Sequence, residues 1–277
     1  MAGRPGRPGR VRSMPIHATR FKLLTSAALA GALALAGCTT TGTTGSIGAG
    51  APQTESDWRR EADIWGPRYN KNPADADAAY RYARALRANG QRAQAAAVLE
   101  QATISNPRNT LLLGAYGRAL ADIGNYKQAL EVLRRAHTPD QPDWRILSAQ
   151  GAVLDQMGRH EEARRHYATA LKIMPDEPSV LSNLGLSYAL SKNLPKAEET
   201  LRLASEQKGA EPRVRQNLAL VIGLQGRFAE AEQIARGDLS PEEATANVAY
   251  LRQMIEQERG RKKGRGAPSP LKDAANS

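Results

Sequence analysis

The strongest constraint on the fold is a repeat of 34 residues that runs through most of the chain. No insertion or deletion interrupts it over five units, which begin near residues 76, 110, 144, 178 and 212. Self-similarity at a fixed period of this length is the signature of a solenoid, in which each unit buries its apolar face against its neighbours. When the units are aligned on one another, equivalent positions form columns. The column that shows the period best contains an alanine in every unit: Ala95, Ala129, Ala163, Ala197 and Ala231.

Three further columns predict two helices joined by a turn in each unit. A glycine column predicts the turn, because glycine adopts positive φ without strain; Lys192 is its one departure. Small residues in the first helix allow a close crossing, and large residues in the second helix fill the space between them. The turn column holds Gly90, Gly124, Gly158 and Gly226, the small column Ala83, Gly117, Gly151, Gly185 and Ala219, and the large column Leu99, Leu133, Tyr167 and Leu201.

The third unit displays the pattern most completely. It reads "WRILSAQGAVLDQMGRHEEARRHYATALKIMPDE", from Trp144 to Glu177, and it resembles the tetratricopeptide repeat, a helix-turn-helix unit of this period. The resemblance implies an all-α solenoid of about five repeats over residues 76–239. It also implies a body that binds other proteins.

Both ends of the repeat region look capped. Residues 57–75 predict a capping helix, with Trp65 where a second helix would contribute its large residue. Residues 240–258 predict another, because Ser240 suits an N-cap, Pro241 suits the first helical position and Glu243 completes a capping box. We expect the basic tail over residues 259–277 to be disordered.

The beginning of the chain has the features of an export signal. Six basic residues and no acidic ones precede an uncharged run from Leu23 to Gly37. The run has about 15 residues, whereas a membrane-spanning helix needs roughly 20. We therefore expect residues 1–37 to form a signal peptide. Starting at Met14 would give a signal of ordinary length, so we expect Met14 to be the initiator.

Cys38, the only cysteine of the chain, directly follows this apolar run. The sequence Leu35-Ala36-Gly37-Cys38 resembles the lipobox of bacterial lipoproteins. In that family the cysteine thiol takes a diacylglyceryl group, a peptidase cuts before the cysteine, and the freed amine is acylated, with palmitate as a typical chain. The resemblance implies lipidation of Cys38 and no other cofactor. Each buried methylene contributes about 0.8 kcal/mol, so three chains would hold the protein at a membrane. The alternative is an ordinary signal peptide with an incidental cysteine.

The residues after Cys38 predict a flexible tether. Residues 38–56 are mostly Thr, Gly, Ser, Ala and Pro, which cannot form a core, so the tether would span roughly 20–25 Å. Without a second cysteine there is no disulfide. Thr39 stands where an aspartate causes inner-membrane retention in some bacteria. The resemblance therefore favours the outer membrane over the inner membrane, with the repeats facing the periplasm.

The net charge of +11 is confined to the ends of the chain. The signal contributes +6 and the tail from Arg259 contributes +5, so residues 38–258 are neutral overall. A neutral, exported body argues against nucleic-acid binding. The tail is most simply a solvated end, and the alternative is contact with anionic lipid headgroups, where each Lys or Arg can add about 1 kcal/mol.

No motif in the sequence predicts catalysis or a metal site. The segment "HEEARRH" lacks the pair of histidines four residues apart that a zinc helix needs, because Arg164 occupies the second place. We expect His160 and His166 to be solvent-facing residues of a repeat. There is no phosphate loop and no nucleophile motif, so we expect a protein that is not an enzyme.

Candidate binding residues lie on the first helices, which line a groove in solenoids of this kind. Asn183 and Asn217 are 34 residues apart, and in some tetratricopeptide proteins an asparagine at this place bonds the backbone of a bound peptide. An amide suits that task because it offers both donor and acceptor. The alternative is that these polar residues merely solvate the groove. The basic residues nearby could receive acidic side chains, and the full candidate set is Asn183, Asn217, Arg84, Arg87, Arg118, Arg213 and Gln216.

The segment from Arg213 to Met254 suggests a narrower family. A degenerate last repeat there leads into "DLSPEE" and a helix containing "NVAYL". Together with the lipobox, linker and repeats, this resembles the TadD-like lipoproteins of the Flp/Tad (tight adherence) pilus assembly system. The resemblance implies a pilotin-like helper of the outer-membrane secretin, with protein partners of the pilus and secretin assembly.

Two other classes of function compete with this reading. The first is an envelope-biogenesis lipoprotein that activates a peptidoglycan synthase or assists β-barrel assembly. The second is an enzyme acting on peptidoglycan, which lacks room because a catalytic domain needs roughly 100 residues. The sequence names neither the partner segment nor the oligomeric state.

Overall fold

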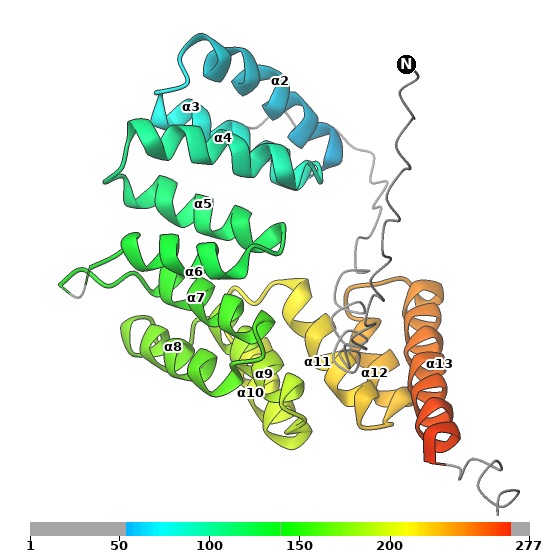
Figure 1. Ribbon diagram of the computed structural model, residues 1–277. Coiled ribbons are helices and arrows are strands. Elements are labelled where there is room, and N and C mark those ends of the chain that lie inside the picture. Colours follow the sequence, from blue (N-terminus) through cyan, green and yellow to red (C-terminus); the bar gives the residue numbers. More distant parts are fainter. Residues whose placement is uncertain (1–53, 139, 267–277) are drawn as a thin grey trace, which may run out of the picture. The chain divides into compact units, whose positions relative to one another are not determined.

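The computed structural model describes residues 54–138 and 140–266, which are entirely helical apart from their turns. The expected signal peptide, Cys38, most of the tether and the end of the tail lie outside the described residues. Twelve helices follow one another along the described part of the chain (Figure 1), and it contains no β-strand. The all-α fold predicted from the sequence is therefore confirmed.

The helices form five antiparallel pairs between two capping helices (Figure 1). The first helices of the pairs begin at the expected unit starts, and each packs on its own second helix and on the preceding pair. The pairs are α3 (Ala76–Ala88) with α4 (Arg92–Ser105), α5 (Thr110–Asp122) with α6 (Tyr126–Arg135), α7 (Trp144–Gln156) with α8 (His160–Ile173), α9 (Pro178–Leu190) with α10 (Leu194–Glu206), and α11 (Pro212–Leu224) with α12 (Phe228–Ala235).

The turn within each pair repeats one backbone geometry. Gly158 has φ of 75°, and the next residue, Arg159, donates its N–H to the Leu154 carbonyl at 2.9 Å. This six-residue closure at a left-handed residue is the Schellman motif that ends many helices. Lys192, the departure from the glycine column, adopts the same conformation with φ of 66°. The geometry of the turn is thus set by the repeat rather than by glycine alone.

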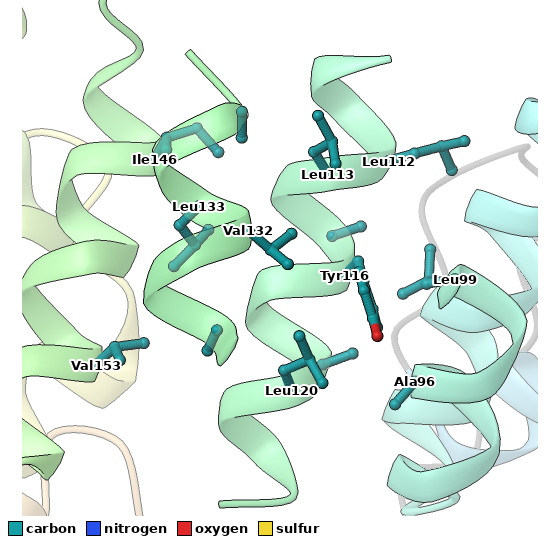
Figure 2. Close-up of a cluster of buried hydrophobic side chains, with 14 of the residues drawn as sticks. Ala96, Leu99, Leu112, Leu113, Tyr116, Leu120, Val132, Leu133, Ile146 and Val153 are labelled. Carbon is teal, nitrogen blue, oxygen red and sulfur yellow. The ribbon is translucent and has the colours of Figure 1, made fainter. Parts of the chain in front are cut away.

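Close approach of the two helices in a pair requires the small-residue column. A Cβ added at Gly117, Gly151 or Gly185 would lie 2.5–2.6 Å from the large side chain of the paired second helix. Those side chains are Leu133, Tyr167 and Leu201. Figure 2 shows large apolar residues such as Leu99, Leu112 and Leu133 lying in the spaces between successive helices. The core is therefore a continuous series of interfaces.

The capping helices differ in detail from expectation. Helix α2 (Glu55–Lys71) starts at a capping box formed by Thr54 and Asp57. Trp65, expected to be the large packing residue, is only half-buried and carries the guanidinium groups of Arg68 and Arg81 over its ring. Trp65 is thus not a fully buried packing residue like the leucines of the repeats, and its neighbour Gly66 is buried, where an added Cβ would lie 3.2 Å from the ring of Tyr82.

The last helix, α13 (Pro241–Gly266), begins at the expected cap. Ser240 and Glu243 exchange the two hydrogen bonds of a capping box, at 3.0 and 3.2 Å. The helix continues to Gly266, whereas a disordered tail was expected from residue 259. An ion pair between Arg261 and Glu258 supports this additional part, since residues three apart are neighbours on a helix.

Candidate functional site: the face of the first helices

The first helices of the repeats lie on one common face. Besides their own partners, α3 contacts α5, α5 contacts α7, α7 contacts α9, and α9 contacts α11. Second helices of successive repeats show no comparable contact within residues 54–266. All seven candidate binding residues are carried by α3, α5, α9 and α11. We call this surface the first-helix face.

The expected asparagines are brought to equivalent places, but each is already bonded. The amide nitrogen of Asn183 donates to Ser148 Oγ at 3.1 Å, and that of Asn217 donates to Ser182 Oγ at 2.9 Å. Each bond joins one repeat to the repeat before it. The amide oxygens have no bond of this kind to the described residues, so half of each amide is left to meet a partner N–H. Asn183 and Asn217 therefore have a structural role, as links between successive repeats, that the sequence did not reveal.

The other five candidate residues separate into two places on this face. Arg213 is exposed and Gln216 is half-buried at the start of α11. Arg84, Arg87 and Arg118 instead gather around a hollow between α3 and α5, of about 170 Å³, which Tyr80, Ala83, Leu99 and Ala115 complete. The two clusters stand at opposite ends of the repeat array.

The three arginines of the hollow differ in their partners. Arg87 donates through Nε to Asp122 at 2.6 Å, and the guanidinium of Arg84 lies 5.0 Å from the centre of the Trp58 ring. Arg118 is half-buried and forms no hydrogen bond or ion pair with the described residues. Burial first, and the nearby Arg87 second, lower the pKa of Arg118, while Tyr80, Asp143 and Asp122 partly oppose this shift. A positive charge is thus held in a place that disfavours it.

A second, wider depression of about 490 Å³ lies along α9 and α10. Its cationic residues already have partners within the chain. Lys196 lies over the ring of Tyr188, and Arg202 bonds both Glu198 and Glu230. This depression offers apolar surface, including the exposed Leu203, but no unpaired cation among the residues that line it.

A buried polar cluster, which sequence reasoning missed, joins α7, α8 and α9. Asp155 is 7% exposed, and three side chains donate to its carboxylate: His160 Nδ1 at 2.8 Å, Ser187 Oγ at 2.8 Å and the Tyr167 hydroxyl at 3.0 Å. Burial and the adjacent carboxylate raise the pKa of Tyr167, which keeps its hydroxyl protonated as a donor. This cluster, named here the Asp155 cluster, fastens the third repeat to the fourth.

The histidine expectations need correction because His160 and His166 are both half-buried. His160 belongs to the Asp155 cluster, and His166 has a buried Nδ1 without a partner. Burial, followed by His137 and Arg134, lowers the pKa of His166. No three His, Cys, Asp or Glu side chains within the described ranges gather into a group that could hold a metal ion.

The described helices were also compared with the requirements of a membrane-spanning helix. None of those in residues 54–138 and 140–266 combines the length and the apolar character needed to cross a bilayer.

The paired helices, their repeated turns and their shared face define a helical-repeat solenoid of the kind that presents binding surfaces to proteins. Models of the tetratricopeptide repeat match residues 86–151, 156–221 and 212–236. The chain belongs to the tetratricopeptide repeat family.

Solved structures with the same fold share little sequence with this chain. A chain of the APC/C hetero-tetramer Cut9–Hcn1 has a TM-score of 0.59 and 13% identity over 73% of this chain, which spans only 40% of that longer one. PilW, described as a widely conserved type IV pilus biogenesis factor, has a TM-score of 0.56 and 15% identity, covering 66% of this chain and 86% of PilW. PilF from Pseudomonas aeruginosa has a TM-score of 0.51 and 18% identity, covering 69% of this chain and 90% of PilF. No curated protein sequence matches.

Proposed function

We propose that this protein is a noncatalytic lipoprotein that binds protein partners during assembly of the Flp/Tad pilus, as a pilotin-like factor for the outer-membrane secretin. The observation that carries the proposal is a tetratricopeptide solenoid placed behind a signal-like segment that ends in Cys38. The fold likeness to PilW, a pilus biogenesis factor, is consistent with it. So is the TadD-like segment from Arg213 to Met254.

The mechanism that follows is tethered capture. Lipid on Cys38 holds the solenoid at the outer membrane, on its periplasmic face, and residues 38–56 set its reach. Short flexible linkers give effective concentrations in the millimolar range, so a first-helix face of modest affinity can retain a partner near the membrane. The solenoid supplies binding and positioning, and no chemical step is assigned to it.

The test of this function is co-purification from detergent-solubilised membranes of a piliated host. We expect the pilus secretin to be recovered with the wild-type chain. In a strain that lacks this protein, we expect the secretin to form fewer assembled rings. Recovery of a peptidoglycan synthase or of β-barrel assembly proteins, with normal secretin rings, would replace the pilus function by an envelope function.

The role of the anchor is tested by Cys38→Ser supplied with an ordinary cleavable signal. This form should lose lipid labelling, bind the secretin in solution and support pilus assembly poorly. Normal assembly at native expression level would contradict the tethering mechanism while leaving the repeat assignment intact.

The role of the first-helix face is tested by a matched pair of substitutions. Asn217→Ala removes both the inter-repeat bond and the open amide oxygen, whereas Ser182→Ala removes the bond alone. We expect Asn217→Ala to weaken partner recovery and Ser182→Ala to leave it close to wild type. Equal behaviour of the two variants would exclude the amide oxygen as a partner contact.

A further inference from the structure

The last helix, α13, divides into two parts of opposite charge. Residues 241–258 hold four acidic residues and one basic residue, hence a net charge of −3. Residues 259–266, which we call the basic end of α13, hold no acidic residue and carry +5, from Arg259, Arg261, Lys262, Lys263 and Arg265. Lys272 and Asp273 cancel each other in the rest of the chain. The excess charge of the tail therefore belongs to one helical segment.

The first part of α13 packs on α11 and α12. Val248 is buried there, and the guanidinium of Arg252 lies 4.6 Å from the centre of the Phe228 ring. The basic end leaves this packing, because Arg259 is exposed and a Cβ added at Gly260 would meet nothing within 4 Å. It extends the helix by about 12 Å. Figure 1 shows it as the red continuation of α13. The packing of the repeats therefore does not account for this segment.

The helix itself gains little from so much charge. A helix C-terminus favours cations only within its last turn, whereas Arg259 stands about two turns before Gly266. Two pairs of basic residues in this segment are four residues apart, a spacing at which like charges destabilise a helix: Arg259 with Lys263, and Arg261 with Arg265. An anionic partner relieves such repulsion, so the segment is suited to one.

The composition of the basic end favours a bilayer surface over a protein partner. Residues 256–266 contain no large apolar side chain, whereas the centres of protein interfaces are enriched in aromatic residues and depleted in lysine. Dense positive charge without apolar groups is attracted to anionic lipid headgroups. The export signal predicted over residues 1–37 makes a bilayer, rather than a nucleic acid, the polyanionic surface that this protein meets.

We propose that the basic end of α13 binds the anionic headgroups of a lipid bilayer, as a second membrane contact beside the lipid on Cys38. The contact is electrostatic and stays in the headgroup layer, because the segment has no large apolar side chain to insert among the acyl chains. It holds the fifth repeat near the bilayer and so orients the solenoid, which a single anchored end does not. The choice of a bilayer rests on the proposed export, whereas the binding itself does not depend on the anchor.

The test measures co-sedimentation with vesicles, using the soluble Cys38→Ser form so that no lipid anchor contributes. The vesicles consist of phosphatidylcholine alone or of an equal mixture of phosphatidylcholine and phosphatidylglycerol. We expect saturable binding to the mixed vesicles at about 0.1 M salt and its loss at about 1 M, where the Debye length falls from about 10 to about 3 Å. Absence of this binding, or equal binding to both kinds of vesicle, overturns the proposal.

Two triple variants that remove the same amount of charge provide the contrast. One changes the basic end and the other changes exposed residues of α6: Arg261→Gln, Lys262→Gln and Lys263→Gln in the first, and Lys127→Gln, Arg134→Gln and Arg135→Gln in the second. The first should weaken binding to the mixed vesicles at least about tenfold, since each Lys or Arg near an anionic surface contributes about fivefold. The second should leave binding nearly unchanged. Circular dichroism establishes that both are folded, and equal losses in the two variants overturn the proposal.

Truncation and competition locate the contact and identify its partner. A chain that ends at Gly266 should bind the mixed vesicles as the full chain does, and one that ends at Glu258 should not. Displacement of the protein from these vesicles by double-stranded DNA, at a phosphate concentration below that of the lipid, would overturn the bilayer assignment.

The result is also separable from the proposed function. Vesicle binding that depends on the basic end supports this contact even if no secretin co-purifies. Secretin recovery with the first triple variant equal to wild type supports the proposed function without this contact.

Discussion

Two charged side chains on the first helices, Arg118 in the second repeat and Asp155 in the third, are withdrawn from water in opposite ways. Asp155 receives three hydrogen bonds from two further helices. Arg118 receives no comparable partner and faces a hollow. Because burying a charge is costly unless it is hydrogen-bonded, the first arrangement stabilises the stack and the second weakens it. The contrast separates a residue that holds the fold from one that is available for binding.

The largest expected effect comes from removing the satisfied charge. Asp155→Ala leaves the hydroxyls of Tyr167 and Ser187 without their acceptor, so we expect a loss of about 3 kcal/mol in the free energy of unfolding. Asp122→Ala breaks a half-exposed ion pair with Arg87 and should cost less than about 1 kcal/mol. Urea unfolding followed by circular dichroism measures both, and similar losses would remove the distinction drawn between the two sites.

A smaller change isolates one bond of the Asp155 cluster. Tyr167→Phe keeps the ring that packs against Gly151 but removes the hydroxyl that donates to Asp155. We expect a loss of about 1.5 kcal/mol, because the carboxylate oxygen stays buried without that donor. In the second repeat, Tyr116→Phe removes a hydroxyl whose hydrogen-bond partners, Gln128 and Glu100, are exposed to water, so its loss should cost less. A larger loss for Tyr116→Phe would contradict the account.

Backbone strain, rather than charge, is tested at the turn of the fourth repeat. Lys192 has a left-handed conformation that glycine adopts without strain, so Lys192→Gly should raise the free energy of unfolding by about 1 kcal/mol. Gly158→Ala, at the equivalent turn of the third repeat, should lower it by a similar amount. Thermal unfolding of both variants checks the opposite signs, and a destabilised Lys192→Gly would show that the lysine side chain matters there.

The smallest expected effect is a pH dependence in the third repeat. Burial, with His137 and Arg134 next, lowers the pKa of His166 in the folded chain, so the unfolded chain binds this proton more readily. The contribution of neutral His166 to the free energy of unfolding should be fully present above the ordinary histidine pKa and should decrease as the pH falls below about 6.5. His166→Asn should reduce the difference between urea midpoints at pH 5 and pH 7.5. An unchanged difference would exclude His166 as its source.

The repeat boundaries could be read from the sequence because each depends on a column that all units share. The small residues at Gly117, Gly151 and Gly185 are dictated by a close helix crossing, and the turns by left-handed backbone. Such requirements recur in every unit, so a 34-residue shift reveals them. The two-helix unit therefore followed from these columns, and the resemblance to the tetratricopeptide repeat implied the all-α solenoid.

The Asp155 cluster could not be read in this way because it departs from three columns at once. Asp155 stands where other units have Ala121 or Ala189, Tyr167 stands in a leucine column, and Ser187 stands where Val153 and Val221 are buried. The sequence does show three polar residues at positions where neighbouring repeats have apolar ones. Whether these three side chains contact one another depends on how α7, α8 and α9 pack, which the sequence does not show. The arginines were identified from sequence, yet the lack of a partner at Arg118 depends on tertiary structure.

The most direct test of the central claim is the urea unfolding of Arg118→Gln beside the wild-type chain. If the unpaired guanidinium is kept for binding, its removal should raise the free energy of unfolding, by up to about 1 kcal/mol, since no ion pair is lost and a charge leaves a partly desolvated place. A loss of stability comparable to that of Asp155→Ala would contradict the account. Arg118 would then stabilise the fold, as Asp155 does, and the distinction between the two sites would be lost.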